Sequence, residues 1–179
     1  MTNVIWDSST ASGVSISSNT ATGTGSGWNT VDSEQRTSLE GSVEWTMAGQ
    51  YALTGFTLTT SDTMGDTSFA LYLNNGSFEA FTNGTGESIS GSYSTSDTFK
   101  LAISSSGVVT ALQNGSLLHT FSGTAAGNYY IHASLWAGSS VTSTIDIQNV
   151  SDVVEDTPDN TDGSTPLEHI LYLNTRVPK

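Results

Sequence analysis

The stretch that decides the fold lies in the middle of the chain, where residues 99–121 read FKLAISSSGVVTALQNGSLLHTF. Apolar residues alternate with other residues at Phe99, Leu101 and Ile103, and successive side chains of an extended strand point to opposite faces. Asn114-Gly115 follows the second run, and this dipeptide tolerates the positive φ angles of a type I′ hairpin turn. The stretch therefore predicts three antiparallel strands joined by tight turns.

The same period of two continues on both sides of this stretch. Asn75-Gly76 predicts another hairpin between two short runs, and residues 17–27 fit either a loop or a weak edge strand. About a dozen short strands without an internal repeat indicate a two-sheet antiparallel β-sandwich. We assign Trp6 and Trp45 to its core. The alternating apolar sets are Val43, Trp45 and Met47; Phe69, Leu71 and Leu73; and Tyr129, Ile131, Ala133 and Leu135.

Composition excludes several classes of protein. The 179 residues include 4 Lys plus Arg against 17 Asp plus Glu, for a net charge of −13. A phosphate backbone or an anionic membrane surface attracts clustered cations, so we expect neither nucleic acid nor membrane as a partner. No apolar run approaches the ~20 residues that span a bilayer, and residues 1–7 lack the features of a secretory signal. The absence of Cys removes disulfides and thiol chemistry.

The chain divides into three predicted parts. Residues 1–150 form the sandwich, 151–165 an acidic linker containing Pro158, and 166–179 a C-terminal extended arm that docks. The arm fits a short helix or a strand, neither stable alone in water. It docks on its own domain or on a neighbour, and a spacer of this length favours the neighbour. Its predicted docking residues are Leu167, Ile170, Leu171, Tyr172 and Leu173.

Five segments carry a resemblance to a known family: 41–46 (GSVEWT), 69–73 (FALYL), 96–103 (SDTFKLAI), 108–118 (VVTALQNGSLL) and 129–135 (YYIHASL). Through them, residues 28–150 resemble the concanavalin A-like lectin/glucanase superfamily in its short, SPRY-like form. The resemblance implies an antiparallel jelly-roll sandwich, a fold that hosts lectins, glycosidases and scaffolding domains. Similar sandwich domains occur in bacteriophage fibres and capsid-decorating proteins.

No catalytic constellation is predicted. The glucanase branch of this superfamily carries Glu-x-Asp-x-x-Glu on one strand, and the segment from Glu40 to Glu44 does not match it. His119 and His132 lie in alternating segments and are interpreted as surface histidines. No Gly-x-Ser-x-Gly elbow is present. We therefore expect a protein that is not an enzyme.

A carbohydrate-binding face is the main candidate site. Exposed aromatic rings beside polar groups bind sugars, and the predicted carbohydrate-binding residues are Trp28, Tyr130, His132 and Trp136. The last three share one parity of a strand, opposite the core row. No cofactor and no metal ligand set is predicted; for the loop with Asp62 and Asp66 the alternatives are a bound calcium ion and solvated turn acids, and the turn acids are preferred because the spacing fits no calcium loop.

Two functions remain open. The first is a structural virion protein of a bacteriophage, a capsid decoration or fibre component anchored through its C-terminal arm to other virion proteins or to copies of itself. The second is a carbohydrate-binding lectin or adhesion module. The two overlap, because a virion protein can also bind host-surface glycan. The expected location is the virion under the first prediction and otherwise extracellular.

Overall fold

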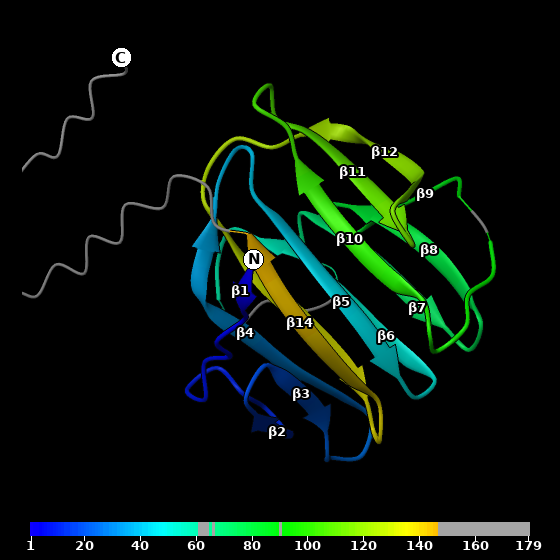
Figure 1. The fold of residues 1–179 in the computed structure, drawn as a ribbon. Coiled ribbons are helices and arrows are strands. Elements are labelled where there is room, and N and C mark those ends of the chain that lie inside the picture. Colours follow the sequence, from blue (N-terminus) through cyan, green and yellow to red (C-terminus); the bar gives the residue numbers. More distant parts are fainter. Residues whose placement is uncertain (61–64, 66, 90, 147–179) are drawn as a thin grey trace, which may run out of the picture.

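The protein folds as two antiparallel β-sheets packed face to face. The computed structural model describes residues 1–60, 65, 67–89 and 91–146, and its secondary structure over those residues consists of strands β1 to β14 without a helix (Figure 1). No helix that could cross a membrane occurs within these residues. The predicted all-β class and two-sheet sandwich are therefore confirmed. The predicted linker 151–165 and arm 166–179 lie outside the described residues.

The larger sheet has eight strands and contains the middle stretch quoted above. The neighbours of each strand are fixed by hydrogen-bonded register, and β1 (Thr2–Asn3) pairs with the end of β14. Its remaining strands lie side by side in the order β12 (Ser116–Thr124), β11 (Val108–Gln113), β10 (Thr98–Ile103), β5 (Ser42–Ala48), β14 (Ser140–Asp146), β3 (Thr20–Gly23) and β2 (Val14–Ser17).

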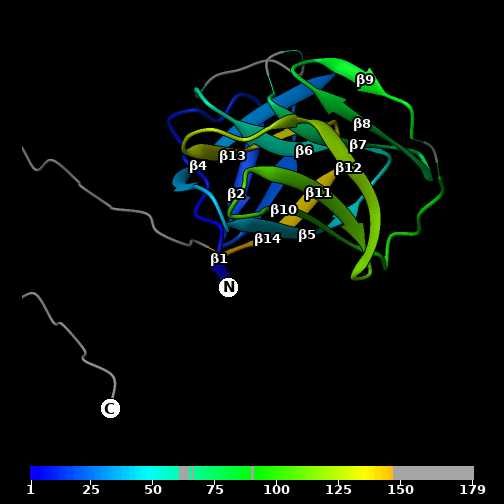
Figure 2. The same cartoon turned by 90° about the horizontal axis from the view of Figure 1, so that it is seen from above.

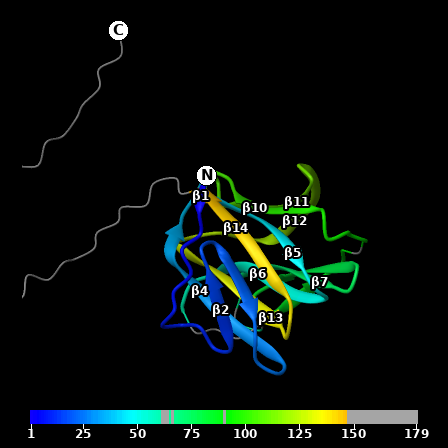
Figure 3. The same ribbon diagram turned by 60° about the horizontal axis from the view of Figure 1, so that its bottom comes forward.

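The smaller sheet has six strands and lies against the larger one, as Figure 2 shows from above. Figure 3 shows β2 near β4, at the edge where the first hairpin approaches the smaller sheet. The order of the six strands is β4 (Trp28–Thr37), β13 (Tyr129–Trp136), β6 (Tyr51–Thr57), β7 (Phe69–Asn74), β8 (Ser77–Thr82) and β9 (Thr85–Glu87).

The core lies between the sheets and is built from the alternating apolar rows. Trp45, Phe99 and Leu101 from the larger sheet and Phe56 and Ile131 from the smaller one are at most 1% exposed. Trp45 stacks on Phe99 with ring centroids 5.9 Å apart. Each such burial contributes roughly 1.5–3 kcal/mol relative to an exposed side chain. Trp6 is also in the core, 3% exposed, so both predicted core tryptophans are confirmed.

The turns follow the predicted chemistry. Asn114 and Gly115 have φ of 51° and 78°, and Asn75 and Gly76 have 44° and 92°. These are the positive values that a type I′ turn requires at both central residues. The three-stranded meander is therefore β10-β11-β12, and the Asn75-Gly76 hairpin joins β7 to β8.

Two local features add to the sequence predictions. Residues 17–27, for which a loop and a weak edge strand were the alternatives, contribute to a hairpin of β2 and β3. β2 is an edge strand, and β3 pairs with both β2 and β14. In the Thr-rich segment 57–60, β6 ends at Thr57, and Leu58 is 51% exposed. Thr57 Oγ1 donates a hydrogen bond to the Thr59 carbonyl, and this local contact replaces strand pairing there.

Candidate functional site

Four aromatic side chains gather on the outer face of the six-stranded sheet, at the end where β4 and β6 begin and β13 ends. Trp28 lies directly opposite Trp136 in the pairing of β4 with β13. The register of β13 with β6 then brings Tyr51 beside Trp136. On the next strand, Tyr72 of β7 lies opposite Leu53 of β6. Strand pairing thus assembles the aromatic pocket, defined as Trp28, Tyr51, Tyr72 and Trp136, from four strands.

The planes of neighbouring rings in the aromatic pocket are steeply inclined to one another. Trp28 and Trp136 have ring centroids 5.7 Å apart and planes at 78°, and Trp28 meets Tyr72 at 5.8 Å and 59°. Tyr51 meets Trp136 at 6.2 Å and 76°. These four residues line a pocket of about 470 Å³, within the roughly 300–1,000 Å³ of small-molecule sites. The four rings therefore line an open pocket of the size that small molecules occupy.

Both tryptophans of the aromatic pocket remain accessible. Trp28 is 40% exposed and Trp136 is 39% exposed, whereas Trp6 and Trp45 are buried. Large apolar rings left in water are costly and mark interaction surfaces when they cluster. Because two neighbouring rings are exposed in the same hollow, the pocket can accept the apolar face of a ligand.

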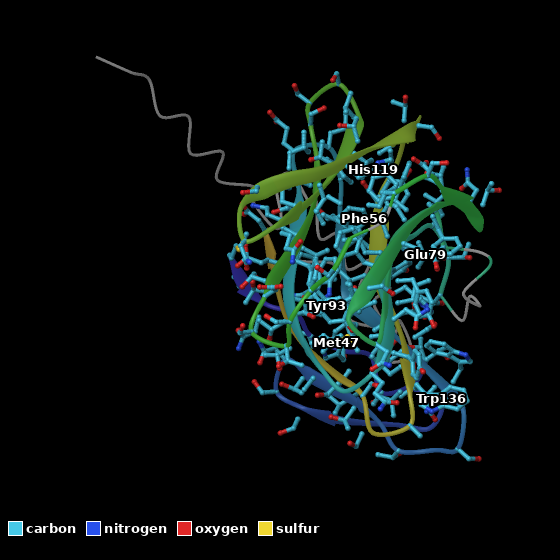
Figure 4. The ribbon with its side chains drawn as sticks, turned by 90° about the vertical axis from the view of Figure 1, so that its right-hand side faces the viewer. Met47, Phe56, Glu79, Tyr93, His119 and Trp136 are labelled. Atoms are coloured by element: carbon cyan, nitrogen blue, oxygen red, sulfur yellow. The ribbon has the colours of Figure 1, made fainter. Side chains whose placement is uncertain are left out.

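A carboxylate lies at the rim of the aromatic pocket. Glu79 on β8 is directly opposite Tyr72 and is exposed. Figure 4 shows the labelled Glu79 and Trp136 on the same side of the ribbon. Burial, together with the neighbouring Tyr51, Glu79 and Tyr93, raises the pKa of the Tyr72 hydroxyl above its ordinary value. The phenol of Tyr72 therefore stays protonated at neutral pH and can donate a hydrogen bond.

The two fixed cations of the described residues lie elsewhere. Arg36 is eight residues along β4 from Trp28, roughly 27 Å at 3.4 Å per residue. Its guanidinium lies 4.2 Å from the ring centre of Tyr130 and donates a hydrogen bond to that hydroxyl. Lys100 is on β10 of the other sheet, opposite Glu44. Neither fixed cation of the described residues therefore lies at the aromatic pocket.

The structure brings together two of the four predicted carbohydrate-binding residues. Trp28 and Trp136 share the pocket, but Tyr130 is six residues along β13 from Trp136, roughly 20 Å away. His132 is fully buried, so its interpretation as a surface residue is wrong. Alternation along β13 correctly predicted that Tyr130, His132 and Trp136 point away from the core. It did not predict that the outer face of the sheet is covered at His132.

His132 belongs to a buried polar network. Its Nδ1 is 2.8 Å from Asp32 Oδ1 and its Nε2 is 2.8 Å from Ser134 Oγ. Asp32 and Ser134 are each 1% exposed. These are the residue types of a nucleophilic triad, but a buried Ser134 hydroxyl offers no approach for a substrate carbonyl. The network therefore satisfies polar groups beneath the outer face and ties β4 to β13.

His119, the other predicted surface histidine, contacts the opposite sheet at one edge of the sandwich. His119 on β12 hydrogen-bonds Glu87 on β9, with side chains 18% and 12% exposed. Glu87 also accepts hydrogen bonds from Thr82 Oγ1 and from Ser122 N and Oγ. Burial raises the pKa of Glu87, but these hydrogen bonds outweigh it and lower the pKa to about 2. We call this cluster the Glu87 clasp, because it joins the edge strands of the two sheets.

The structure bears on the remaining site predictions only in part. No group of three or more potential metal ligands occurs among the described residues. Asp62 and Asp66, the alternative calcium ligands, fall in segments that are not described, as do all five predicted docking residues of the arm.

Sequence reasoning missed Tyr51, Tyr72 and Glu79. The outward direction of Tyr72 was available from its alternation with Leu71 and Leu73. Its place beside the two tryptophans was not available, because it depends on the register of β6 between β13 and β7.

Comparisons with known proteins place the fold but give no relative in sequence. No family model and no curated protein sequence matches the chain. Solved structures match at low identity. The PSpry domain of TRIM65 covers 79% of this chain and 92% of its own, with 17% identity and a TM-score of 0.65.

Two further solved structures also match, a Man-bound domain and a carbohydrate binding module. The exoplasmic/lumenal domain of VIP36, in a Ca²⁺/Man-bound form, has 12% identity and a TM-score of 0.58, covering 84% of this chain and 86% of its own. The carbohydrate binding module CBM66 from Bacillus subtilis has 14% identity and a TM-score of 0.56, covering 82% of this chain and 98% of its own. At these identities the likeness establishes the arrangement of strands alone.

Proposed function

We propose that this domain, which has the concanavalin A-like jelly-roll fold of the structures above, is a carbohydrate-binding module. The observation that carries the proposal is the aromatic pocket, in which Trp28 and Trp136 are about 40% exposed and share one hollow with Tyr51 and Tyr72. Two of the similar structures are a carbohydrate binding module and a Man-bound domain, which supports the same reading.

The physical basis is the amphipathic character of sugar rings. One face of a pyranose or furanose presents C–H groups that pack on an aromatic ring, and its hydroxyls need hydrogen-bonding partners at the edge. The pocket offers Trp28 and Trp136 for the first requirement. Asn74, directly opposite both Tyr51 and Ser77, and Glu79, opposite Tyr72, supply polar groups nearby for the second.

Binding to a glycan array, followed by titration of the best ligand, tests the proposal. Central aromatic anchors typically lose about 2 kcal/mol or more when truncated, so Trp136→Ala and Trp28→Ala should each weaken binding about 30-fold. Leu117→Ala is the matched control, since Leu117 is 64% exposed and lies on β12 of the other sheet. Absence of any glycan signal, or binding unchanged by both tryptophan substitutions, would refute the proposal.

A second candidate is a structural component of a bacteriophage virion, anchored through residues 166–179, with the virion as its location. The sequence features that favour it are the net charge of −13 and an acidic segment at 151–165 followed by Leu167, Ile170 and Leu171. Light scattering on the full chain and on a chain ending at Asp152 tests it. The full chain should assemble and the shortened chain should remain a folded monomer; equal assembly of both would exclude the anchoring role.

A further inference from the structure

We propose that the aromatic pocket selects glycans that carry an alkylammonium group, either a choline-type substituent or a free amino sugar, over neutral and anionic glycans. The inference rests on the proposed carbohydrate-binding function and adds the charge of the ligand to it. Three features carry the inference: the inclination of the ring walls, the carboxylate at the rim, and the remoteness of fixed cations.

The ring walls suit a compact cation. The three ring pairs formed by the four residues are inclined at 59°, 76° and 78°, so no single flat platform extends over all four rings. An aromatic face attracts a cation positioned within about 6 Å of its centre, with Trp the strongest partner. Two of the four lining residues are Trp, and each is about 40% exposed, so part of each indole is accessible to an ammonium group.

The rim adds negative charge to the attraction of the ring faces. Glu79 lies directly opposite Tyr72 on the same face of the sheet, and opposed side chains there have Cβ atoms roughly 4.5–5.5 Å apart. The whole chain carries a net charge of −13. A cation is therefore favoured at long range by the net charge and at short range by Glu79.

An anionic ligand meets the opposite situation. A uronate, sialate or phosphate group needs an arginine, a lysine or an array of donors to offset its charge. Arg36 contacts Tyr130 roughly 27 Å along β4 from Trp28, and Lys100 lies on the other sheet opposite Glu44. Among the described residues, neither fixed cation is placed to offset the charge of an anionic sugar beside Glu79, so the pocket should disfavour such a sugar.

Titration of the full chain, monitored by tryptophan fluorescence, tests the inference with pairs of ligands that differ in charge. Choline is compared with 3,3-dimethylbutan-1-ol, in which carbon replaces the charged nitrogen. A glucosamine oligomer is compared with the N-acetylglucosamine oligomer of the same length, and glucuronic acid is the anionic ligand. At least one cationic member should bind about five- to thirtyfold tighter than its neutral partner, and the tighter arm identifies the source of the ammonium group.

Substitutions separate the contributions to this preference. Glu79→Gln should reduce the preference for the cation several-fold while leaving binding of the neutral partner unchanged. Trp136→Ala should weaken binding of the cationic partner and of the neutral partner, each by about 30-fold. Glu34→Gln is the control for net charge, because Glu34 is exposed on β4 at a distance from the pocket. The charge comparison itself uses the unsubstituted protein, so it does not depend on the folding of any variant.

The outcomes distinguish this inference from the function on which it rests. The charge preference would be overturned if the cationic and neutral members of both pairs bound with equal affinity. If Trp136→Ala still weakened that binding, the proposed carbohydrate-binding function would stand. An equal loss of preference in Glu34→Gln and Glu79→Gln would also overturn it, because the net charge alone would then explain the effect. No binding in any arm, together with a silent glycan array, would overturn both.

Discussion

Replacing Glu87 by Gln should lower the stability of the fold at neutral pH and remove one acid-sensitive contribution to it. The clasp carboxylate has a pKa of about 2 in the folded protein against an ordinary value of 4.5. At 1.36 kcal/mol per pH unit, this difference sets an upper limit of about 3 kcal/mol on the stabilisation by the charged form. Solvent screening at this partly exposed edge reduces it to about 1–2 kcal/mol.

The direction of the pH dependence follows from the lowered pKa. The stabilisation by Glu87 is fully present above about pH 4.5 and is lost as the pH falls toward 2, because the folded state then has to take up a proton that the unfolded state already holds. Gln keeps the shape of the side chain but cannot carry the charge. The free-energy difference between the two proteins should therefore be about 1–2 kcal/mol at pH 7 and shrink between pH 4.5 and 2.

Urea unfolding followed by tryptophan fluorescence at several pH values between 2 and 7 measures this difference. Asp97, whose pKa is also lowered to about 2 by hydrogen bonds from Asn114, Ser94 and Gln113, contributes equally to both proteins and cancels. Glu34→Gln serves as the control for removal of an exposed carboxylate. If the stability curves of the wild type and Glu87→Gln run parallel across this range, the clasp is not an electrostatic contact and the reasoning fails.

Three further predictions concern backbone packing, the buried network and the core. Gly55→Ala should destabilise the fold by about 2 kcal/mol or more, since the added Cβ would lie 2.2 Å from the Phe69 carbonyl oxygen. Gly115→Ala should cost about 1 kcal/mol, because Gly115 has open space around it but a φ of 78°. Equal losses for both variants in thermal unfolding would contradict this ranking. Asp32→Ala should cost about 1–3 kcal/mol by leaving the buried Nδ1 of His132 without its hydrogen-bond partner. Urea unfolding with no loss of stability would show that this hydrogen bond is dispensable. Leu101→Ala should cost about 2–5 kcal/mol in calorimetry because the side chain is fully buried; an unchanged melting temperature would contradict its place in the core.

The fold was predictable because its information is local. Period-two alternation identifies strands such as β10, and Asn-Gly pairs identify the turns that join β10, β11 and β12, since both depend on residues close together in the sequence. The end of β6 at Thr57 was not predictable, because a run of threonines is compatible with a strand and with a loop alike.

The candidate site was predictable only in part because it is assembled by register. Trp28 and Trp136 are 108 positions apart in the sequence and lie opposite each other only through the pairing of β4 with β13. Their aromatic character suggested a sugar site, but alternation gives the direction of a side chain and not its exposure. His132 follows the same parity as Trp136 and is nevertheless buried beside Asp32, so only tertiary contacts separate the two.

The pairing of β1 with β14 also determines how the domain can present its ligand site. Thr2 lies opposite Ile145, so the first residues and Asp146 emerge next to each other, whereas β14 begins at Ser140, just after Trp136. Six steps of extended chain, roughly 20 Å, separate the two ends of β14. A partner attached before β1 or directly after Asp146 would therefore join the module at the end of β14 that lies away from the tryptophans.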